Sequence, residues 1–143
     1  MEYRKMTGLH DSEEHLKKQA KEDPESLFRD IEKSEDHCYL TYAVEYLGHV
    51  DKEYRDRALE LLERFLDKYN SDTDPKHFIV REGVIYGLLA LHWLSDSDGS
   101  NEENPELILF WERISQIISF YTYHSNEKSW AVRASAIDTM MLL

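Results

Sequence analysis

Seven histidines are the side chains in this sequence that are best suited to bind a metal ion or transfer a proton. No two of them are four residues apart, which is the spacing that places two ligands on one face of a helix. They are scattered along the chain at His10, His15, His37, His49, His77, His92 and His124. The pattern therefore predicts structural or surface histidines and no metal site.

The single cysteine, Cys38, directly follows His37. A cysteine and a histidine can act as nucleophile and base, but neighbouring residues point to different faces of a helix. We therefore expect Cys38 to be a small thiol in the core. One cysteine cannot form a disulfide within the chain.

Carboxylates beside arginines, such as Glu82 next to Arg81, are a second candidate for acid and base chemistry. On helices such charges more commonly form solvated faces or surface ion pairs that contribute less than about 1 kcal/mol. An acidic stretch around Asp96 and Asp98 resembles the start of a calcium loop, but its glycine and glutamates are not at the required positions. The sequence predicts no catalytic residue, no cofactor and no bound metal.

Aromatic residues are better candidates for binding, because Tyr and Trp bury a large area with little loss of entropy. Three tyrosines between 39 and 46 recur at helical spacing, and Tyr86 and Trp93 are seven residues apart. Such stripes usually pack in a core, but an exposed stripe would form a binding surface rimmed by carboxylates. The candidate partner-binding residues are Tyr39, Tyr42, Tyr46, Glu45, Glu82, Tyr86, Trp93 and Asp138.

The overall charge restricts the class of partner. The chain has 143 residues, with 29 acidic and 17 basic side chains and a formal net charge of -12. This balance argues against nucleic acid, whose binding depends on Lys and Arg, and favours a basic protein. Without a leader or a run of about 18 apolar residues, we expect a cytoplasmic protein with no membrane segment.

The elements that position these residues are all predicted to be helices, because no strand alternation or hairpin signal is present. Apolar residues recur at three and four, and prolines mark helix starts after Asp23 and Asp74. Asp51 is a further predicted cap, and the last helix is expected to begin near Glu127. We expect one domain over 1–143, with a polar helix or arm over 1–22, helical hairpins over 24–50, 51–94 and 105–143, and an acidic loop after residue 94.

Two stretches repeat one layout at an offset of 52. Residues 78–91 read FIVREGVIYGLLAL and residues 130–143 read WAVRASAIDTMMLL. The offset aligns Val80 with Val132, Arg81 with Arg133, Gly83 with Ser135 and, in the preceding helices, Leu62 with Ile114 and Phe65 with Ile117. A shift of 40 aligns residues 40–46 with 80–86. Three hairpins thus recur at roughly forty residues, the period of two-helix solenoid repeats.

Two glycines, Gly83 and Gly87, lie inside the most apolar predicted helix. Each costs about 0.5–1 kcal/mol relative to Ala in a helix interior. They share one face, so a neighbouring helix can approach that face closely and offset the cost.

The segments VREGVIYGLLAL and AVRASAIDTMMLL resemble the second helix of HEAT repeats, which opens with a Val-Arg pair followed by small and aliphatic residues. The resemblance covers roughly residues 37–143 and implies an all-α, right-handed α-solenoid of about three hairpins. It also implies that an Asp in the turn pairs with the Arg of the next helix, here Asp74 with Arg81; before Arg133 only Asn126 and Glu127 are available.

These features predict a non-catalytic protein-binding module. The chain is also similar to small bacterial HEAT-repeat proteins, some of them encoded near toxins, which implies an acidic immunity or inhibitor protein that binds a cationic toxin. A scaffold that self-assembles through the apolar end MMLL is the alternative. A DNA glycosylase of the helical-solenoid type is disfavoured, because it needs a basic groove.

Overall fold

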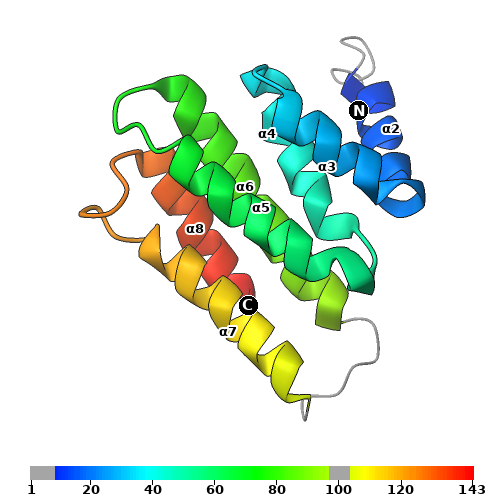
Figure 1. Ribbon diagram of the computed structural model, residues 1–143. Coiled ribbons are helices and arrows are strands. Elements are labelled where there is room, and N and C mark those ends of the chain that lie inside the picture. Colours follow the sequence, from blue (N-terminus) through cyan, green and yellow to red (C-terminus); the bar gives the residue numbers. More distant parts are fainter. Residues whose placement is uncertain (1–8, 97–103) are drawn as a thin grey trace.

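The computed structural model describes residues 9–96 and 104–143 (Figure 1). Nearly all of the acidic loop with the calcium-like pattern lies outside the described residues. All regular elements of the described chain are helices and none is a strand, so the prediction of an all-α fold is confirmed. Its elements are α2 (Leu9–Glu22), α3 (Pro24–Lys33), α4 (His37–Tyr46), the 3-10 turns η1 (Leu47–His49) and η2 (Lys52–Tyr54), α5 (Arg55–Lys68), α6 (Pro75–Asp96), α7 (Pro105–Phe120) and α8 (Trp130–Leu142).

Most predicted helix starts are correct, because local side-chain chemistry determines them. The side chain of Asp23 accepts a hydrogen bond from the Ser26 amide, and Pro24 opens α3. The Asp74 carboxylate accepts from the Lys76 amide at the start of α6. Asn104 caps α7, which begins at Pro105.

Two predicted starts are wrong. The side chain of Asp51 makes no capping hydrogen bond, and α5 begins only after the 3-10 turn η2. Asp51 instead lies 3.6 Å from Nζ of Lys21 in α2. The last helix begins at Trp130 and not near Glu127, because Ser129 is the capping residue and accepts from the Val132 amide.

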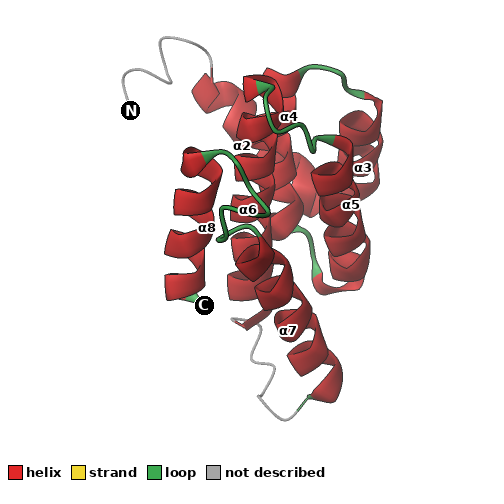
Figure 2. Ribbon diagram, turned by 90° about the vertical axis from the view of Figure 1, so that its left-hand side faces the viewer, coloured by secondary structure: helices red, strands yellow, loops and turns green. Residues whose placement is uncertain are grey.

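The helices form two layers with α6 in the centre (Figures 1 and 2). In one layer α6 lies between α4 and α8, and α5 and α7 of the other layer pack across it. Residues of every helix from α2 to α8 contribute to one continuous hydrophobic cluster. The most apolar predicted helix, which contains Gly83 and Gly87, is therefore the central helix of the fold.

The glycines of α6 allow α4 to approach closely. A Cβ at Gly83 would lie 2.4 Å from the Thr41 carbonyl oxygen, and one at Gly87 would lie 2.7 Å from the Val44 carbonyl oxygen. Backbone atoms of α4 cannot move aside independently, so no larger residue fits without separating the helices. The predicted close approach is confirmed, and the helix that makes it is α4.

The apolar character of α6 follows from this central position. By length and composition, residues 75–95 resemble a membrane span, but 56% of that window is buried inside the structure. A helix with neighbours on several sides needs apolar residues over most of its circumference. Packing against other helices is therefore sufficient to explain the hydropathy of α6.

Candidate protein-binding face

Large exposed apolar side chains are concentrated in the second half of the described chain. All of those that are at least 36% exposed occur at or after Ile79, and they are Ile79, Tyr86, Trp93, Ile108, Leu109, Phe120, Tyr123, Trp130, Ile137, Met141 and Leu142. Exposed apolar patches on folded proteins commonly mark interaction surfaces. The helices α6, α7 and α8 therefore carry the candidate site.

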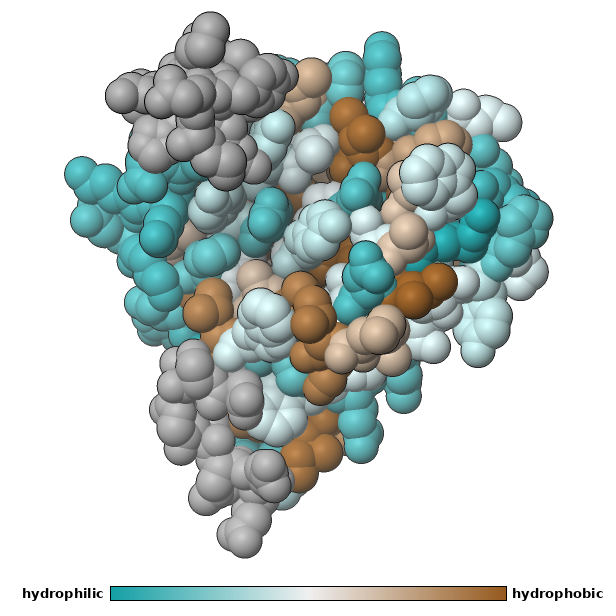
Figure 3. All heavy atoms as spheres, turned by 180° about the vertical axis from the view of Figure 1, so that it is seen from behind, coloured by the Kyte–Doolittle hydropathy of each residue, from teal (hydrophilic) through white to brown (hydrophobic). Residues whose placement is uncertain are grey.

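Three of these side chains form what we call the α6 stripe: Ile79, Tyr86 and Trp93. They are seven residues apart, so they lie on one face of α6. This face is turned away from the α5 and α7 layer, because Val80, Val84, Leu88 and Leu91, on other faces of α6, are fully buried. Seen from behind, apolar side chains gather in the middle and lower part of this surface (Figure 3).

Hydrogen bonds hold the α6 stripe against α8. The hydroxyl of Tyr86 lies 3.3 Å from Oγ of Ser135, and Nε1 of Trp93 donates to the Leu142 carbonyl oxygen at 3.3 Å. Tyr86 is 39% exposed and Trp93 is 49% exposed. Each ring is therefore fixed at one end and accessible at the other, which lowers the entropy cost of using it as an anchor in a complex.

The predicted tyrosines of α4 are less accessible than Tyr86. Tyr39, Tyr42 and Tyr46 are half-buried and pack against the hydrophobic core. Burial raises the pKa of Tyr39 to about 12, and the carboxylate of Asp30 adds to this shift. The Tyr46 ring lies 5.1 Å from that of His49. These tyrosines contribute mainly to packing.

The predicted carboxylates lie on α4, α6 and α8, the helices of one layer. Glu82 is half-buried and accepts a hydrogen bond from Oγ of Ser135 at 2.8 Å, Glu45 is half-buried on α4, and Asp138 is exposed on α8. Of the 17 basic residues of the chain, α4, α6 and α8 carry only Lys76, Arg81 and Arg133. Of these charged residues only Asp138 and Lys76 are exposed, so the layer presents few charges of either sign.

Arg81 pairs with Glu127 and not with Asp74, so the pairing implied by the resemblance is wrong. Nε and Nη2 of Arg81 donate to the two carboxylate oxygens of Glu127, each at 2.6 Å. Nη1 donates to the carbonyl oxygens of Tyr69 and Ser71. Asp74 lies 3.7 Å from the His77 ring instead.

Glu127 accepts hydrogen bonds from both repeated arginines, Arg81 and Arg133. Its carboxylate binds Arg81 and accepts from the Ser129 amide, and its backbone carbonyl accepts from Nη1 of Arg133 at 2.7 Å. The Arg81 and Glu127 side chains are 3% and 1% exposed. We call this arrangement the Arg81 clamp. It joins the end of α5, the middle of α6 and the turn before α8, and so fixes the orientation of the α7–α8 hairpin.

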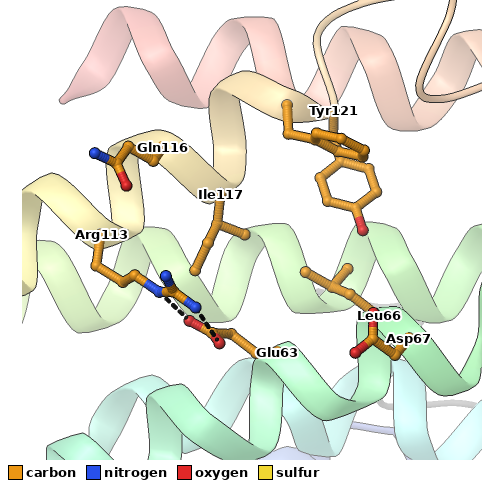
Figure 4. A pocket seen from close by; sticks show the side chains of 8 residues that line it. Glu63, Leu66, Asp67, Arg113, Gln116, Ile117 and Tyr121 are labelled. Atoms are coloured by element: carbon orange, nitrogen blue, oxygen red, sulfur yellow. Dashed lines mark hydrogen bonds and ion pairs between the residues drawn. The ribbon is translucent and has the colours of Figure 1, made fainter.

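A groove of about 330 Å³ lies between α5 and α7 (Figure 4). Leu66 and Ile117 contribute apolar surface, and a bidentate ion pair between Arg113 and Glu63 crosses one part of it. Phe120 and Tyr121 line the groove near the end of α7, with ring centroids 5.0 Å apart. No histidine, cysteine or serine is among the lining residues, and its two carboxylates are Glu63, which is paired with Arg113, and Asp67.

The same groove continues toward the Arg81 clamp. Asp67, Tyr121 and Glu127 line this continuation. Burial raises the pKa of Tyr121 to about 12. The carboxylates of Glu127 and Asp67 also raise this pKa, and the Arg81 guanidinium lowers it. Tyr121 is therefore a neutral hydroxyl near physiological pH, suited to hydrogen bonding and not to proton transfer.

Cys38 is exposed, so the prediction of a core thiol is wrong. The reason is its position at the start of α4, where Asp36 accepts hydrogen bonds from the amides of Cys38 and Tyr39. Ligand atoms of Asp36, His37 and Cys38 lie within 4.8 Å of one another, although adjacent residues were expected to diverge. These three could serve as metal ligands, but structural zinc sites use four.

The sequence prediction missed the exposed side chains of α7 and α8. Residues 107–111 read LILFW, five consecutive apolar positions where one buried helix face needs only two or three. The excess predicts exposure, and Leu109 is indeed 65% exposed. Met141 belongs to the apolar end MMLL that the sequence analysis singled out, but the exposure of Trp130 had no comparable signal, because periodicity does not distinguish a core face from an unpaired one.

No protein-family model matches this sequence, and neither the curated proteins nor the solved structures contain a significant match.

Proposed function

We propose that this chain is a non-catalytic protein-binding module that holds a protein partner on the face formed by α4, α6 and α8. The observation that carries the proposal is the α6 stripe. Ile79, Tyr86 and Trp93 are large side chains that remain exposed on one side of the central helix of the fold. Anchored aromatic residues of this kind contribute most of the binding energy in many protein interfaces.

Charge supports a basic partner. The formal net charge is -12, and the layer that presents the α6 stripe has few cations, with Arg81 buried in the clamp. A net negative charge attracts a basic surface and repels nucleic acid. Electrostatic attraction of this type raises the association rate and specificity, while the aromatic residues hold the complex.

We also propose that the fold is a right-handed HEAT-like solenoid of about three hairpins. The packing of α4, α6 and α8 side by side supports this arrangement, as does the burial of Val80 and Val132 at equivalent positions of two hairpins. In this proposal the Arg81 clamp replaces the usual pairing of Asp and Arg between repeats.

The sharper form of the proposal is an acidic immunity or inhibitor protein of the cytoplasm that covers the active site of a cationic toxin. A small acidic module with preformed aromatic anchors suits this role. A DNA glycosylase is less favoured, because it would need a basic groove and this chain has 29 acidic side chains against 17 basic ones.

Affinity purification of the tagged chain from its native host, at low and at high salt, tests the proposal. Mass spectrometry should identify one dominant basic protein that is retained less well at high salt, because ions screen charge attraction. Recovery of no partner would contradict the proposal, and retention that rises with salt would contradict the charge argument.

A self-assembling scaffold is the second candidate function. The specific observation in its favour is the exposed side of α8, where Trp130 is 76% exposed and Met141 is 80% exposed.

A further inference from the structure

The outer side of α8 repeats the side of α6 on which α8 itself packs. On α6, Glu82 and Tyr86 contact Ser135 of α8, and the neighbouring Ile85 and Leu89 are buried. At the offset of 52, Glu82 corresponds to Ala134 and Tyr86 to Asp138. Ile85 corresponds to Ile137 and Leu89 to Met141. All four equivalents are exposed. The same surface is thus covered in one repeat and uncovered in the next.

The change in exposure is large for the apolar members. Ile85 is fully buried while its equivalent Ile137 is 46% exposed, and Leu89 is 8% exposed while Met141 is 80% exposed. In the described part of the chain, α8 packs against α6 and α7, and it forms the left-hand edge in Figure 2. α8 buries the equivalent side of α6. A further helix of suitable shape would bury the outer side of α8 in the same way.

We propose that a second copy of this chain covers this side, with the two α8 helices packed antiparallel about a two-fold axis. Trp130, Ala134, Ile137 and Met141 fall on one face, at the spacing four, three and four. We call them the α8 stripe. A two-fold interface brings one surface against itself, so the stripe must be complementary to its own reverse.

The α8 stripe meets this requirement. An axis that passes between positions 135 and 136 brings Trp130 level with Met141 of the other copy, and Ala134 level with Ile137. The first match places a thioether against an aromatic ring, which is a favourable contact. The second places a small side chain opposite a large one, which allows the helices to approach.

Charge favours a second copy over a basic partner at this side. Asp138 is the one exposed charged residue of α8, and the rest of its outer side is apolar or small. A basic protein would gain little here, whereas two copies that each carry a net charge of -12 meet where their charge is lowest. One helix face is smaller than the roughly 800 Å² per partner of a standard interface, so we expect a dimer of micromolar affinity.

Sedimentation equilibrium of the full chain tests this proposal from about 10 µM to about 1 mM. The mass should rise from that of the 17.0 kDa monomer toward twice that value. Met141→Glu should remain monomeric, because it buries a carboxylate against Trp130. Leu109→Glu, a matched change on α7 that is also exposed, should dimerise normally. A monomer at every concentration, or equal effects of both variants, would overturn the proposal.

Crosslinking tests the antiparallel register. In a Cys38→Ser background, a short bis-maleimide should link a mixture of the Trp130→Cys and Met141→Cys variants into heterodimers, because each heterodimer keeps one natural Trp130–Met141 contact, and it should not link either variant alone. In the antiparallel register two copies of one variant hold their cysteines eleven residues apart along the helix, about 16 Å, so a short reagent does not join them. Efficient linking by Trp130→Cys alone would indicate a parallel pair and overturn the register. These experiments use the isolated protein, so their outcome is independent of the partner proposed above.

Discussion

The guanidinium of Arg81 and the carboxylate of Glu127 form a buried bidentate pair across 46 residues of sequence, with both N–O distances at 2.6 Å. Both side chains are almost fully buried. A buried ion pair tolerates loss of one partner poorly, because the remaining charge stays desolvated. The pair therefore determines how the α7–α8 hairpin, and with it the α6 stripe, is held in place.

Glu127→Gln should lower the free energy of unfolding by about 3–5 kcal/mol, because it leaves the Arg81 charge buried and unpaired. Glu63→Gln is a matched control, since Glu63 forms the same bidentate pair with Arg113 in a solvent-exposed setting. It should cost less than about 1 kcal/mol. Urea denaturation measures both. Equal losses in the two variants would show that the Arg81 clamp has no special structural role.

Gly83→Ala should destabilise the protein by about 1–3 kcal/mol, although Ala is the better helix former. The reason is the 2.4 Å approach of the added Cβ to the Thr41 carbonyl oxygen. Ala134→Gly on the exposed side of α8 is the control and should cost only about 1 kcal/mol of helix propensity. Thermal unfolding distinguishes the two effects. A more stable Gly83→Ala protein would exclude close contact between α4 and α6.

Stability should fall between pH 10 and pH 12. The pKa of Tyr121 is raised from 10.0 to about 12 in the folded protein, chiefly by burial. As the pH rises, the unfolded chain therefore loses this proton at a lower pH than the folded protein does. The contribution of Tyr121 to the free energy of unfolding is complete below pH 10 and is lost as the pH rises through 12. Tyr39, whose pKa is also raised to about 12, acts in the same direction.

Tyr121→Phe should reduce the alkaline loss, since it removes one of these protons. The titration of tyrosinate absorbance and unfolding curves at several pH values measure the effect. If the variant and the natural chain lose stability equally steeply between pH 10 and pH 12, the ionisation of Tyr121 does not cause the alkaline loss of stability.

Cys38 should react with a thiol reagent in the folded protein almost as fast as in urea, because its side chain is exposed. A strong protection that disappears on unfolding would restore the prediction of a buried thiol. Labelling followed by mass spectrometry measures the rate. Cys38→Ser should leave the free energy of unfolding nearly unchanged, as expected for an exposed position.

Local signals in the sequence predicted the helices well. Pro24, Pro75 and Pro105 mark three helix starts. The influence of each proline on the backbone extends over only one turn, so it can be read from the neighbouring residues. The prediction that Asp51 caps α5 was wrong because the chain forms a 3-10 turn before α5. The Asp51 carboxylate lies near Lys21 instead.

Tertiary relationships were less predictable. Gly83 and Gly87 indicated a close helix contact but did not identify α4 as the partner. Nothing local connects Arg81 to Glu127, because the packing of α7 and α8 decides that pairing. The exposed apolar residues of α6 and α8 have the same types as core residues, so only the three-dimensional arrangement shows which of them are exposed.

The central claim is that the α6 stripe binds a protein partner, and the most direct test is a comparison of captured proteins among three versions of the chain. The double variant Tyr86→Ala and Trp93→Ala removes two anchors, while Leu109→Ala removes a still more exposed apolar side chain from α7. Circular dichroism should confirm that all three fold. We expect the natural chain and Leu109→Ala to capture the same basic protein and the double variant to lose it. Equal capture by all three, or no partner for any, would contradict the claim.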